Sequence, residues 1–433
     1  MKVLLVSHNP ISISNNMGKT FLSLFSAFQV EELCQFYVHP SLPDVKKCDS
    51  YYRITDNNVL KGLMKFSVNG TVIQNEEISE NKTVENLDTV RTASRKTPAR
   101  YLVRDFVWKI SNWYTKKLKN WVSTQNPDII FLAPGYAKFI YDIALKISKE
   151  FDLPIVVYIC DDYYFVQNGG SFLKRIQVRQ LKRKIAKLMG HTSEIISICD
   201  EIKDNYERKF NVPCTTLMTG SSFKVEESSK YFIEEKHDKN AFVYLGNVRC
   251  NRYKSLIEIG QALKNINSKN KTDYKLKIYT SENDEKILSQ LKSVSTIELC
   301  GYVSGDEFLQ TLCSAEVLVH TESFDDDMID LVKNSISTKI ADSLASGRKF
   351  FAYGPENIAS VKYLKSNGAA YVAVNSTELE EILLRAMTEN GADVIERAKE
   401  CALKNHDSEK TSQALYERLK TVCKGAVDED SAN

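Results

Sequence analysis

Ser335-Ile-Ser-Thr-Lys-Ile-Ala-Asp-Ser-Leu-Ala-Ser-Gly347 is followed directly by Arg348-Lys-Phe-Phe-Ala-Tyr-Gly-Pro355, and together they are the stretch that decides the fold. The hydroxyl residues are typical of a helix start, and Gly347 is typical of a helix end. The apolar run Phe350 to Tyr353 predicts a strand. A helix that begins beside a strand end in an α/β sheet presents unpaired backbone N–H groups, so the stretch predicts an anion site.

Asp342 lies one turn further along the same predicted helix. A carboxylate at that place can accept hydrogen bonds from the hydroxyls of a sugar. Phosphate-binding N–H groups combined with a carboxylate for a ribose indicate a nucleotide ligand, and we expect a nucleotide-sugar.

The stretch resembles the donor-site block of retaining GT-B glycosyltransferases of family 4, in which an acidic helix is followed by small residues, a glycine and a strand. Ser337, Thr338, Lys339, Asp342 and Gly347 carry the resemblance, and the order of the predicted elements extends it along nearly the whole chain. The resemblance implies an α/β fold of two Rossmann-like doubly wound domains that face across a cleft. It also implies donor contacts by these residues, retention of anomeric configuration, and no metal at the diphosphate.

Length and composition limit the possibilities further. With 433 residues the chain is too long for one ordinary core, so we expect two domains. The net charge of +2 does not favour nucleic acid as a partner, and the ten cysteines without a CxxC pair are typical of a reducing compartment. The six histidines lack metal-ligand spacing, so no structural zinc site is expected. The chain also lacks the GxGxxG of NAD- and FAD-binding folds, so no cofactor is expected. The N-terminal apolar run is too short for a signal peptide, which predicts a cytoplasmic protein.

Apolar runs alternate with helical patterns in two cycles, which predicts two parallel sheets covered by helices. We expect the N-terminal, acceptor-side domain at residues 1–228 and the donor-binding domain at residues 229–405, with a final helix at 406–424 that returns to the first domain. Residues 65–92 are polar and β-favouring, and we expect an irregular insertion or a hairpin there. The strands are expected at residues 3–7, 128–132, 155–159 and 194–198, and then at 241–246, 276–279, 297–299, 317–320, 350–353 and 370–374.

The first loop, His8-Asn-Pro-Ile-Ser-Ile-Ser-Asn-Asn-Met-Gly18-Lys-Thr20, contains a Gly-Lys-Thr sequence. A phosphate-binding P-loop needs a glycine five residues before Gly18, but Ile13 stands there, and the chain has no GxGxxG. We expect Gly18 to let the backbone approach a ligand at a helix start, with a plain β–α turn as the alternative.

A second loop, Leu245-Gly246-Asn-Val-Arg249-Cys-Asn-Arg252-Tyr-Lys254, follows a predicted strand and precedes a helix. Gly246 opens a turn, and the cations resemble those that hold the donor diphosphate in the family. Arg252 is the preferred candidate, with Lys254 or Arg249 second, because a fixed cation would stabilise charge on the departing nucleotide. The alternative is a set of solvated surface charges.

Carboxylates and a histidine follow several predicted strands. In the family two glutamates have seven residues between them, but in this chain Asn334 and Asp342 occupy those positions. Glu322, which follows a strand end, is a candidate to supply the missing carboxylate. Asp161, beside Asp162, and His8 are candidates to orient or deprotonate an acceptor hydroxyl. Caps or structural contacts are the alternative for each.

All three tryptophans lie between residues 100 and 121, in a segment rich in cations. Treated as one helix, Leu102, Phe106, Ile110, Trp113, Leu118 and Trp121 share a face, whereas Trp108 falls on the polar face. A second basic segment, Lys174 to Lys187, holds seven cations and no acid. Trp108, Trp113, Lys116 and Lys117 are therefore candidates for binding an anionic membrane surface or a lipid-linked acceptor. An ordinary helix that buries its apolar face is the alternative.

We therefore expect a cytoplasmic hexosyltransferase that moves a sugar from a nucleotide-sugar to a hydroxyl of a lipid-linked or surface-polysaccharide precursor, with peripheral binding to the inner face of the membrane left open. A nucleotide-sugar epimerase on the same fold and a non-catalytic GT-B partner subunit are the rivals. The donor base and sugar, the acceptor, the linkage and the oligomeric state are not readable from the sequence.

Overall fold

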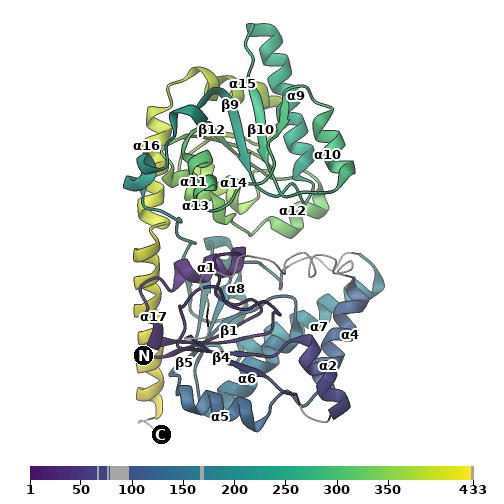
Figure 1. Cartoon of the computed structure of the whole chain (residues 1–433), viewed down its shortest axis with the longest axis vertical. Coiled ribbons are helices and arrows are strands. Elements are labelled where there is room, and N and C mark those ends of the chain that lie inside the picture. The colour runs from purple at the N-terminus through teal and green to yellow at the C-terminus, as the bar shows by residue number, and fades with distance from the viewer. Residues whose placement is uncertain (66–67, 76–77, 79–96, 166–169, 431–433) are drawn as a thin grey trace. The chain divides into compact units, whose positions relative to one another are not determined.

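The computed structural model describes residues 1–65, 68–75, 78, 97–165 and 170–430 (Figure 1). The chain forms two compact units, Met1–Met218 with Glu409–Asn433 and Thr219–Ser408. The change of unit after Met218 comes earlier than the expected boundary after residue 228, because the segment that follows packs on the second unit. His406 donates through Nδ1 to the Thr219 carbonyl at 2.8 Å, and the Ile233 N–H donates to Ser314 Oγ at 2.8 Å.

The first unit is built around an eight-stranded sheet of order β4-β3-β2-β1-β5-β6-β7-β8. Neighbouring strands are parallel except β3 and β4. Because β1 lies between β2 and β5, the strand order reverses there, as in doubly wound folds that bind ligands at the carboxyl ends of their strands. The strands are β1 Val3–Ser7, β2 Leu33–Tyr37, β3 Ser50–Arg53, β4 Thr71–Gln74, β5 Ile129–Ala133, β6 Ile155–Ile159, β7 Glu194–Ser197 and β8 Cys214–Thr216.

Helices cover this sheet, and the last helix of the chain belongs to the same core. Leu415 and Leu419 of α17 are fully buried among side chains of the central strands. Arg418 of the same helix donates through Nε to Glu194 at 2.8 Å. The helices of this unit are α1 Asn16–Leu24, α2 Asp56–Lys65, α4 Pro98–Ile110, α5 Lys116–Gln125, α6 Lys138–Phe151, α7 Phe172–Met189, α8 Asp200–Phe210 and α17 Ser408–Asp430, with a 3₁₀ turn at Val30–Glu32.

The second unit has a six-stranded, wholly parallel sheet of order β11-β10-β9-β12-β13-β14. Its strands are β9 Asp238–Leu245, β10 Lys275–Tyr279, β11 Ile297–Leu299, β12 Ala315–Thr321, β13 Lys349–Tyr353 and β14 Tyr371–Ala373. Its helices are α9 Arg252–Asn270, α10 Glu285–Lys292, α11 Gly305–Cys313, α12 Asp326–Val332, α13 Thr338–Ala345, α14 Ala359–Ser366, α15 Ser376–Thr388 and α16 Ala392–Asn405, with 3₁₀ turns at Val225–Lys230 and Glu234–Lys236.

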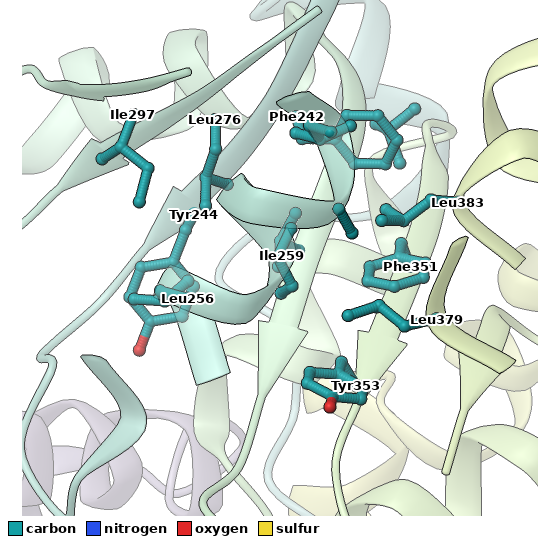
Figure 2. Packing of buried hydrophobic residues seen from close by; sticks show 14 of the residues in the cluster. Phe242, Tyr244, Leu256, Ile259, Leu276, Ile297, Phe351, Tyr353, Leu379 and Leu383 are labelled. Atoms are coloured by element: carbon teal, nitrogen blue, oxygen red, sulfur yellow. The ribbon is translucent and has the colours of Figure 1, made fainter. Parts of the chain in front are cut away.

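One face of this second sheet carries the main core of the unit. Figure 2 shows Phe242 and Phe351 of the sheet packed with Ile259 of α9 and with Leu379 and Leu383 of α15. All five side chains are nearly or fully buried. Strands β9 and β12 pair with each other at the centre of the sheet, and their carboxyl ends form the floor of the site described below.

The region expected as an insertion is only partly described. Thr71–Gln74 pairs antiparallel with β3 as the edge strand β4, and α2, Asp56–Lys65, lies between the two strands in the sequence, so the described part is not a simple hairpin. Residues 66–67, 76–77 and 79–96 lie outside the described residues. Among the helices that the structure describes, none combines the length and the apolar character needed to cross a membrane.

Candidate functional site: a cationic pocket at two strand ends

A pocket of the second unit opens at the carboxyl ends of β9 and β12, which are adjacent parallel strands. The end of β9 supplies Tyr244 to Asn247, and the end of β12 supplies His320 and Thr321. Arg252 at the start of α9 and the start of α13 close the other walls. Strand ends and helix starts therefore meet at one place, which is the usual arrangement of a ligand site in a parallel α/β sheet.

Arg252 is held in this pocket by Glu322. Its Nε donates to Glu322 Oε2 at 2.8 Å and its Nη2 donates to Oε1 at 2.9 Å, so the pair is bidentate. Nη1 donates more weakly to Asn247 Oδ1 at 3.3 Å. A guanidinium carries five N–H donors. Among the residues that the structure describes, these contacts use three, which leaves two for a further anion.

Glu322 is the buried partner of this pair, with 3% of its surface exposed. Burial alone would lower the pKa of the Arg252 guanidinium, but the charge and hydrogen bonds of Glu322 outweigh it, and the pKa is raised. Ser255 Oγ donates to the Glu322 carbonyl at 2.8 Å, which ties α9 to the end of β12. The carboxylate is therefore engaged by Arg252 as a fixed support, which is a different role from the substitute for a missing glutamate that the sequence indicated.

His320 lies beside this ion pair, with its Nε2 at 3.1 Å from Ser360 Oγ and 3.5 Å from Glu322 Oε1. The pKa of His320 is lowered to about 4, mainly by burial; the charge of Glu322 opposes this shift, and the charges of Arg252 and Lys339 contribute to it. The imidazole is therefore neutral at neutral pH. It can exchange hydrogen bonds with its neighbours but adds no positive charge to the pocket.

Lys339 and Ser337 line the pocket where α13 begins. Ser337 is the N-cap residue by backbone conformation, but its side chain makes no capping hydrogen bond. The hydroxyl expected as a cap is therefore available to face the pocket, and the helix start adds a partial positive charge. Thr338 is exposed and is absent from the pocket wall. Of the three predicted residues here, the structure brings Ser337 and Lys339 together with Arg252.

Lys254 and Arg249 do not line this pocket. Lys254 is exposed and forms an ion pair with Asp325 at 2.7 Å, and the exposed Arg249 lies 3.6 Å from Glu282. Gly246 does line it, and a Cβ at that position would come within 3.0 Å of the Tyr244 hydroxyl. The loop therefore contributes one cation to the pocket, its Gly246 leaves room for the Tyr244 ring, and its other two cations face solvent.

Asp342 has a different role from the one predicted, because its carboxylate is engaged by the protein itself. Oδ1 accepts from the Ser222 N–H at 2.6 Å and from Ser221 Oγ at 3.1 Å, and Oδ2 accepts from Ser222 Oγ at 3.3 Å. Asp342 is buried and is not part of the pocket wall. It attaches the first residues of the second unit to α13, so the assignment to a ribose is corrected to a structural one.

Gly18 also has an internal explanation. It lies inside α1, and a Cβ there would come within 2.6 Å of the backbone N and O of Ser12. Its N–H donates to Asn15 Oδ1 at 2.7 Å, which caps the helix. The backbone that approaches Gly18 is therefore the preceding loop of the chain, and the alternative of a β–α turn fits better than a ligand contact.

The acceptor candidates lie at strand ends of the first unit. Asp162 is buried and accepts from the Tyr164 and Phe165 N–H groups at 3.0 Å, so it caps the loop. Asp161 is exposed and accepts from the Tyr163 hydroxyl at 3.2 Å. His8 follows β1 and is half-buried. Its carbonyl accepts hydrogen bonds from the backbone N–H groups of the two residues that follow β2. The structure thus separates the two aspartates into a structural one and an accessible one.

The tryptophan segment is folded differently from the single helix assumed above. Ser111 ends α4, and Thr115 caps a new helix, α5, by accepting from the Leu118 N–H at 3.4 Å. Within α4, Trp108 faces inward with 1% of its surface exposed and stacks on Phe139 at 4.0 Å, whereas Phe106 and Ile110 of the predicted apolar face are 60% and 54% exposed. The placement of Trp108 on a polar face was wrong.

The other candidates of that segment remain at the surface. Trp113 is half-buried between the two helices, and Lys116 and Lys117 are exposed on α5. Lys117 donates through Nζ to the Gly70 carbonyl at 2.9 Å. Their proposed contacts with a membrane or an acceptor stay predictions.

Sequence reasoning missed His320 and Asn247 as members of the pocket. His320 stands in the quoted strand end Val319-His-Thr-Glu322, and Asn247 directly follows Gly246. Position at a strand end was the available signal for both, because side chains there face the ligand edge of a parallel sheet.

No protein-family model matches this chain, and no curated protein matches it in sequence. Solved structures match over nearly its whole length. An α,α-trehalose 6-phosphate synthase from Burkholderia multivorans aligns with a TM-score of 0.62 at 11% identity, over 99% of this chain and 98% of that one. Anabaena HepE in complex with UDP and glucose aligns with a TM-score of 0.63 at 10% identity, over 97% and 100%.

WaaG, a glycosyltransferase involved in lipopolysaccharide biosynthesis, aligns with a TM-score of 0.57 at 13% identity, over 96% of this chain and 99% of that one. At such identities the likeness establishes the fold. The chain has the GT-B fold, with two Rossmann-like α/β units, as the resemblance implied.

Proposed function

We propose that this protein is a glycosyltransferase that transfers a sugar from a nucleotide-sugar to a hydroxyl of a glycan or lipid-linked acceptor, with retention of anomeric configuration. The observation that carries the proposal is the fixed cation Arg252, held by Glu322 beside Lys339 and the start of α13 in one pocket. Two cations and a helix start at a strand end form a site for a diphosphate.

The chemistry follows from this placement of charge. Breaking the bond between sugar and diphosphate leaves negative charge on the departing nucleotide. Donors that are already in position stabilise this charge more effectively than water, because they need no reorganisation during the reaction. Arg252 and Lys339 would hold the diphosphate oxygens, and the backbone of Gly246 would let the ligand lie close to β9. No metal is needed in this scheme.

The comparisons support a nucleotide-sugar as the ligand but do not identify which one. HepE was solved with UDP and glucose, and WaaG takes part in lipopolysaccharide biosynthesis. For this chain we propose a nucleotide-hexose donor and an acceptor that is a precursor of a lipid-linked or surface polysaccharide. Asp161 and His8 are proposed to orient the acceptor hydroxyl, because both lie at carboxyl ends of first-unit strands. Asp161 is the better candidate for the base, because its carboxyl group is exposed to solvent and within reach of an incoming hydroxyl.

A non-catalytic partner subunit is the second candidate, and Asn334 favours it. The family resemblance places a glutamate there, and Asn334 is a buried amide in this chain. Such a protein would bind a nucleotide-sugar and leave it unchanged. An epimerase would convert the donor with no acceptor present.

One experiment separates the three. The protein is incubated with UDP-hexoses and GDP-hexoses, with and without a panel of lipid-linked saccharides, and the nucleotide, the sugar and the product are followed by NMR. Acceptor-dependent release of nucleoside diphosphate together with a product of the donor's anomeric configuration is the expected result. Sugar conversion without acceptor would indicate the epimerase, and tight binding without any turnover would indicate the partner subunit.

A further inference from the structure

The first unit contains a groove of about 520 Å³ among α4, α6 and α7. These three helices pack against one another and lie together at one side of the unit (Figure 1). The groove walls are mainly apolar and include Phe106, Trp108, Trp113, Phe139 and Ile176. It belongs to the first unit alone, so it is distinct from the cationic pocket at β9 and β12.

Large apolar side chains are exposed beside this groove. Val103, Phe106 and Ile110 are spaced by three and four residues on α4, so they form one stripe, and their exposed fractions are 62%, 60% and 54%. Phe172 and Leu173, at the start of α7, are 70% and 42% exposed. Single exposed apolar residues are common on soluble proteins, but a cluster of this kind on neighbouring helices marks a binding surface.

The rim of the same groove is basic. Lys109 of α4 and Arg183 and Lys184 of α7 line it. Lys184 pairs with Asp142 of α6, and Asp105 pairs with the buried Lys138 at 3.1 Å, so the groove's carboxylates are matched by lysines. Helix α7 adds further cations and no acid along its length. The surface therefore combines exposed apolar side chains with an excess of positive charge.

We propose that α4 and α7 form a docking surface for a bilayer that contains anionic lipids, with the groove taking one hydrocarbon chain. Charge complementarity selects this occupant, because anionic headgroups attract the rim cations while the apolar stripe enters the acyl region. Nucleic acid would match the charge but would leave Val103, Phe106 and Ile110 without apolar partners. The surface binds without a spanning helix, in agreement with the described helices.

The structure changes which side chains make this contact. Trp108 is a wall of the groove, with its Nε1 donating to Asp56 Oδ1 at 2.8 Å, and it is not an interfacial anchor. The interfacial anchors are instead Phe106, Ile110 and Phe172. The proposal extends the lipid-linked acceptor of the proposed function, but bilayer binding requires neither the donor pocket nor sugar transfer. An experiment can therefore disprove bilayer binding without disproving sugar transfer, and the reverse.

The test is co-sedimentation of the full chain with vesicles of phosphatidylcholine alone and of phosphatidylcholine with phosphatidylglycerol. Two double variants are compared with the unchanged protein. Phe106→Ser with Ile110→Ser removes the apolar stripe, and Lys109→Gln with Arg183→Gln removes rim charge. The matched controls are Tyr302→Ser, which removes an exposed aromatic ring from the second unit, and Lys286→Gln with Lys292→Gln on α10.

We expect sedimentation with the anionic vesicles only, at least a tenfold weaker binding for each groove variant, and no change for the controls. No sedimentation with anionic vesicles at low salt would overturn the proposal. Equal losses of binding in the controls would overturn it too, as would an oligonucleotide that binds as tightly and displaces the vesicles.

A second measurement reports on the groove itself. All three tryptophans of the chain lie between residues 108 and 121, and two of them line the groove. Phosphatidylglycerol with brominated acyl chains should quench their fluorescence, and Trp113→Phe should remove a large part of the quenching. Sedimentation with no quenching would contradict a hydrocarbon chain in the groove.

Discussion

Arg252 and Glu322 are 70 positions apart in the sequence and form a two-point ion pair, with Nε to Oε2 at 2.8 Å and Nη2 to Oε1 at 2.9 Å. The pair joins the start of α9 to the end of β12. Because both side chains are largely buried, the guanidinium is fixed before any ligand arrives. A cation in a set position loses little freedom when it binds a diphosphate, which favours binding and transfer.

Glu322→Gln should distinguish the effect of the negative charge of Glu322 on Arg252 from the effect of its side-chain volume. The amide keeps the volume but removes the negative charge that competes with a diphosphate for Arg252, so nucleoside diphosphate should bind more tightly. It also removes the charge-assisted bidentate contact, so the guanidinium should be less well placed and kcat should fall roughly tenfold or more. Isothermal titration with UDP and GDP and steady-state kinetics measure the two effects. A variant with weaker diphosphate binding and unchanged kcat would contradict this role.

Asp342→Ala should lower stability and leave ribose recognition intact. The substitution removes the acceptor of the Ser222 N–H and of two hydroxyls, and a buried donor without a partner costs about 1–3 kcal/mol. Chemical denaturation should show this loss with and without nucleotide. The ratio of affinities for a nucleoside diphosphate and its dideoxy analogue should match that of the unchanged protein. A variant of normal stability that no longer distinguishes the two would restore the ribose assignment.

Because of His320, we expect the second unit to lose stability at acidic pH. Its pKa in the folded chain is lowered from 6.5 to about 4, mainly by burial, so the unfolded chain binds more protons between these values. The contribution of the neutral His320 to the free energy of unfolding is therefore fully present above pH 6.5. It is lost as the pH drops toward 4, and the loss is roughly 3 kcal/mol. His406 has the same lowered pKa from burial and adds to the slope. Denaturation of His320→Asn across this range should show a visibly shallower dependence, and an unchanged slope would contradict the assignment.

Gly18→Ala tests whether the first loop has a structural or a ligand-binding glycine. A Cβ would clash with the Ser12 backbone at 2.6 Å, which is expected to cost about 1–3 kcal/mol despite the better helix propensity of alanine. Gly135→Ala is the matched control, since a Cβ there meets nothing within 4 Å. Donor affinity at a temperature where both variants are folded should not change. A stable Gly18→Ala protein with weaker donor binding would reverse the interpretation.

Much of the fold was predictable because buried parallel strands are short apolar runs. Ile155–Ile159 and Ile297–Leu299 lie where the pattern placed them. Strand β2 was missed because Gln35 interrupts its apolar run. The structure buries this amide completely, and it donates to Ser7 Oγ and accepts from the Ile11 N–H. Local periodicity cannot show that a polar side chain finds its partners in neighbouring loops.

The candidate site was predictable in its location and less so in its contacts. The strand-end and helix-start patterns pointed to Arg252, Ser337 and Lys339, which the pocket brings together. The bidentate link to Glu322 and the engagement of Asp342 by Ser222 depend on contacts between segments that are distant in the sequence. Trp108 was misplaced because periodicity shows which residues of a helix share a face but not which face packs on a neighbour, and α4 buries the face of Trp108 against Phe139.

Titration of UDP-hexoses and GDP-hexoses against the unchanged chain and its arginine and lysine variants tests the central claim most directly. In Arg252→Ala the nucleotide-sugar affinity should fall at least tenfold, and the loss of its partner from buried Glu322 should cost about 3–5 kcal/mol of stability. Arg252→Met with Glu322→Met should recover stability without recovering affinity. Lys254→Ala, which removes an exposed and solvent-screened ion pair, should change neither. Full donor affinity in the Met–Met protein would contradict the account.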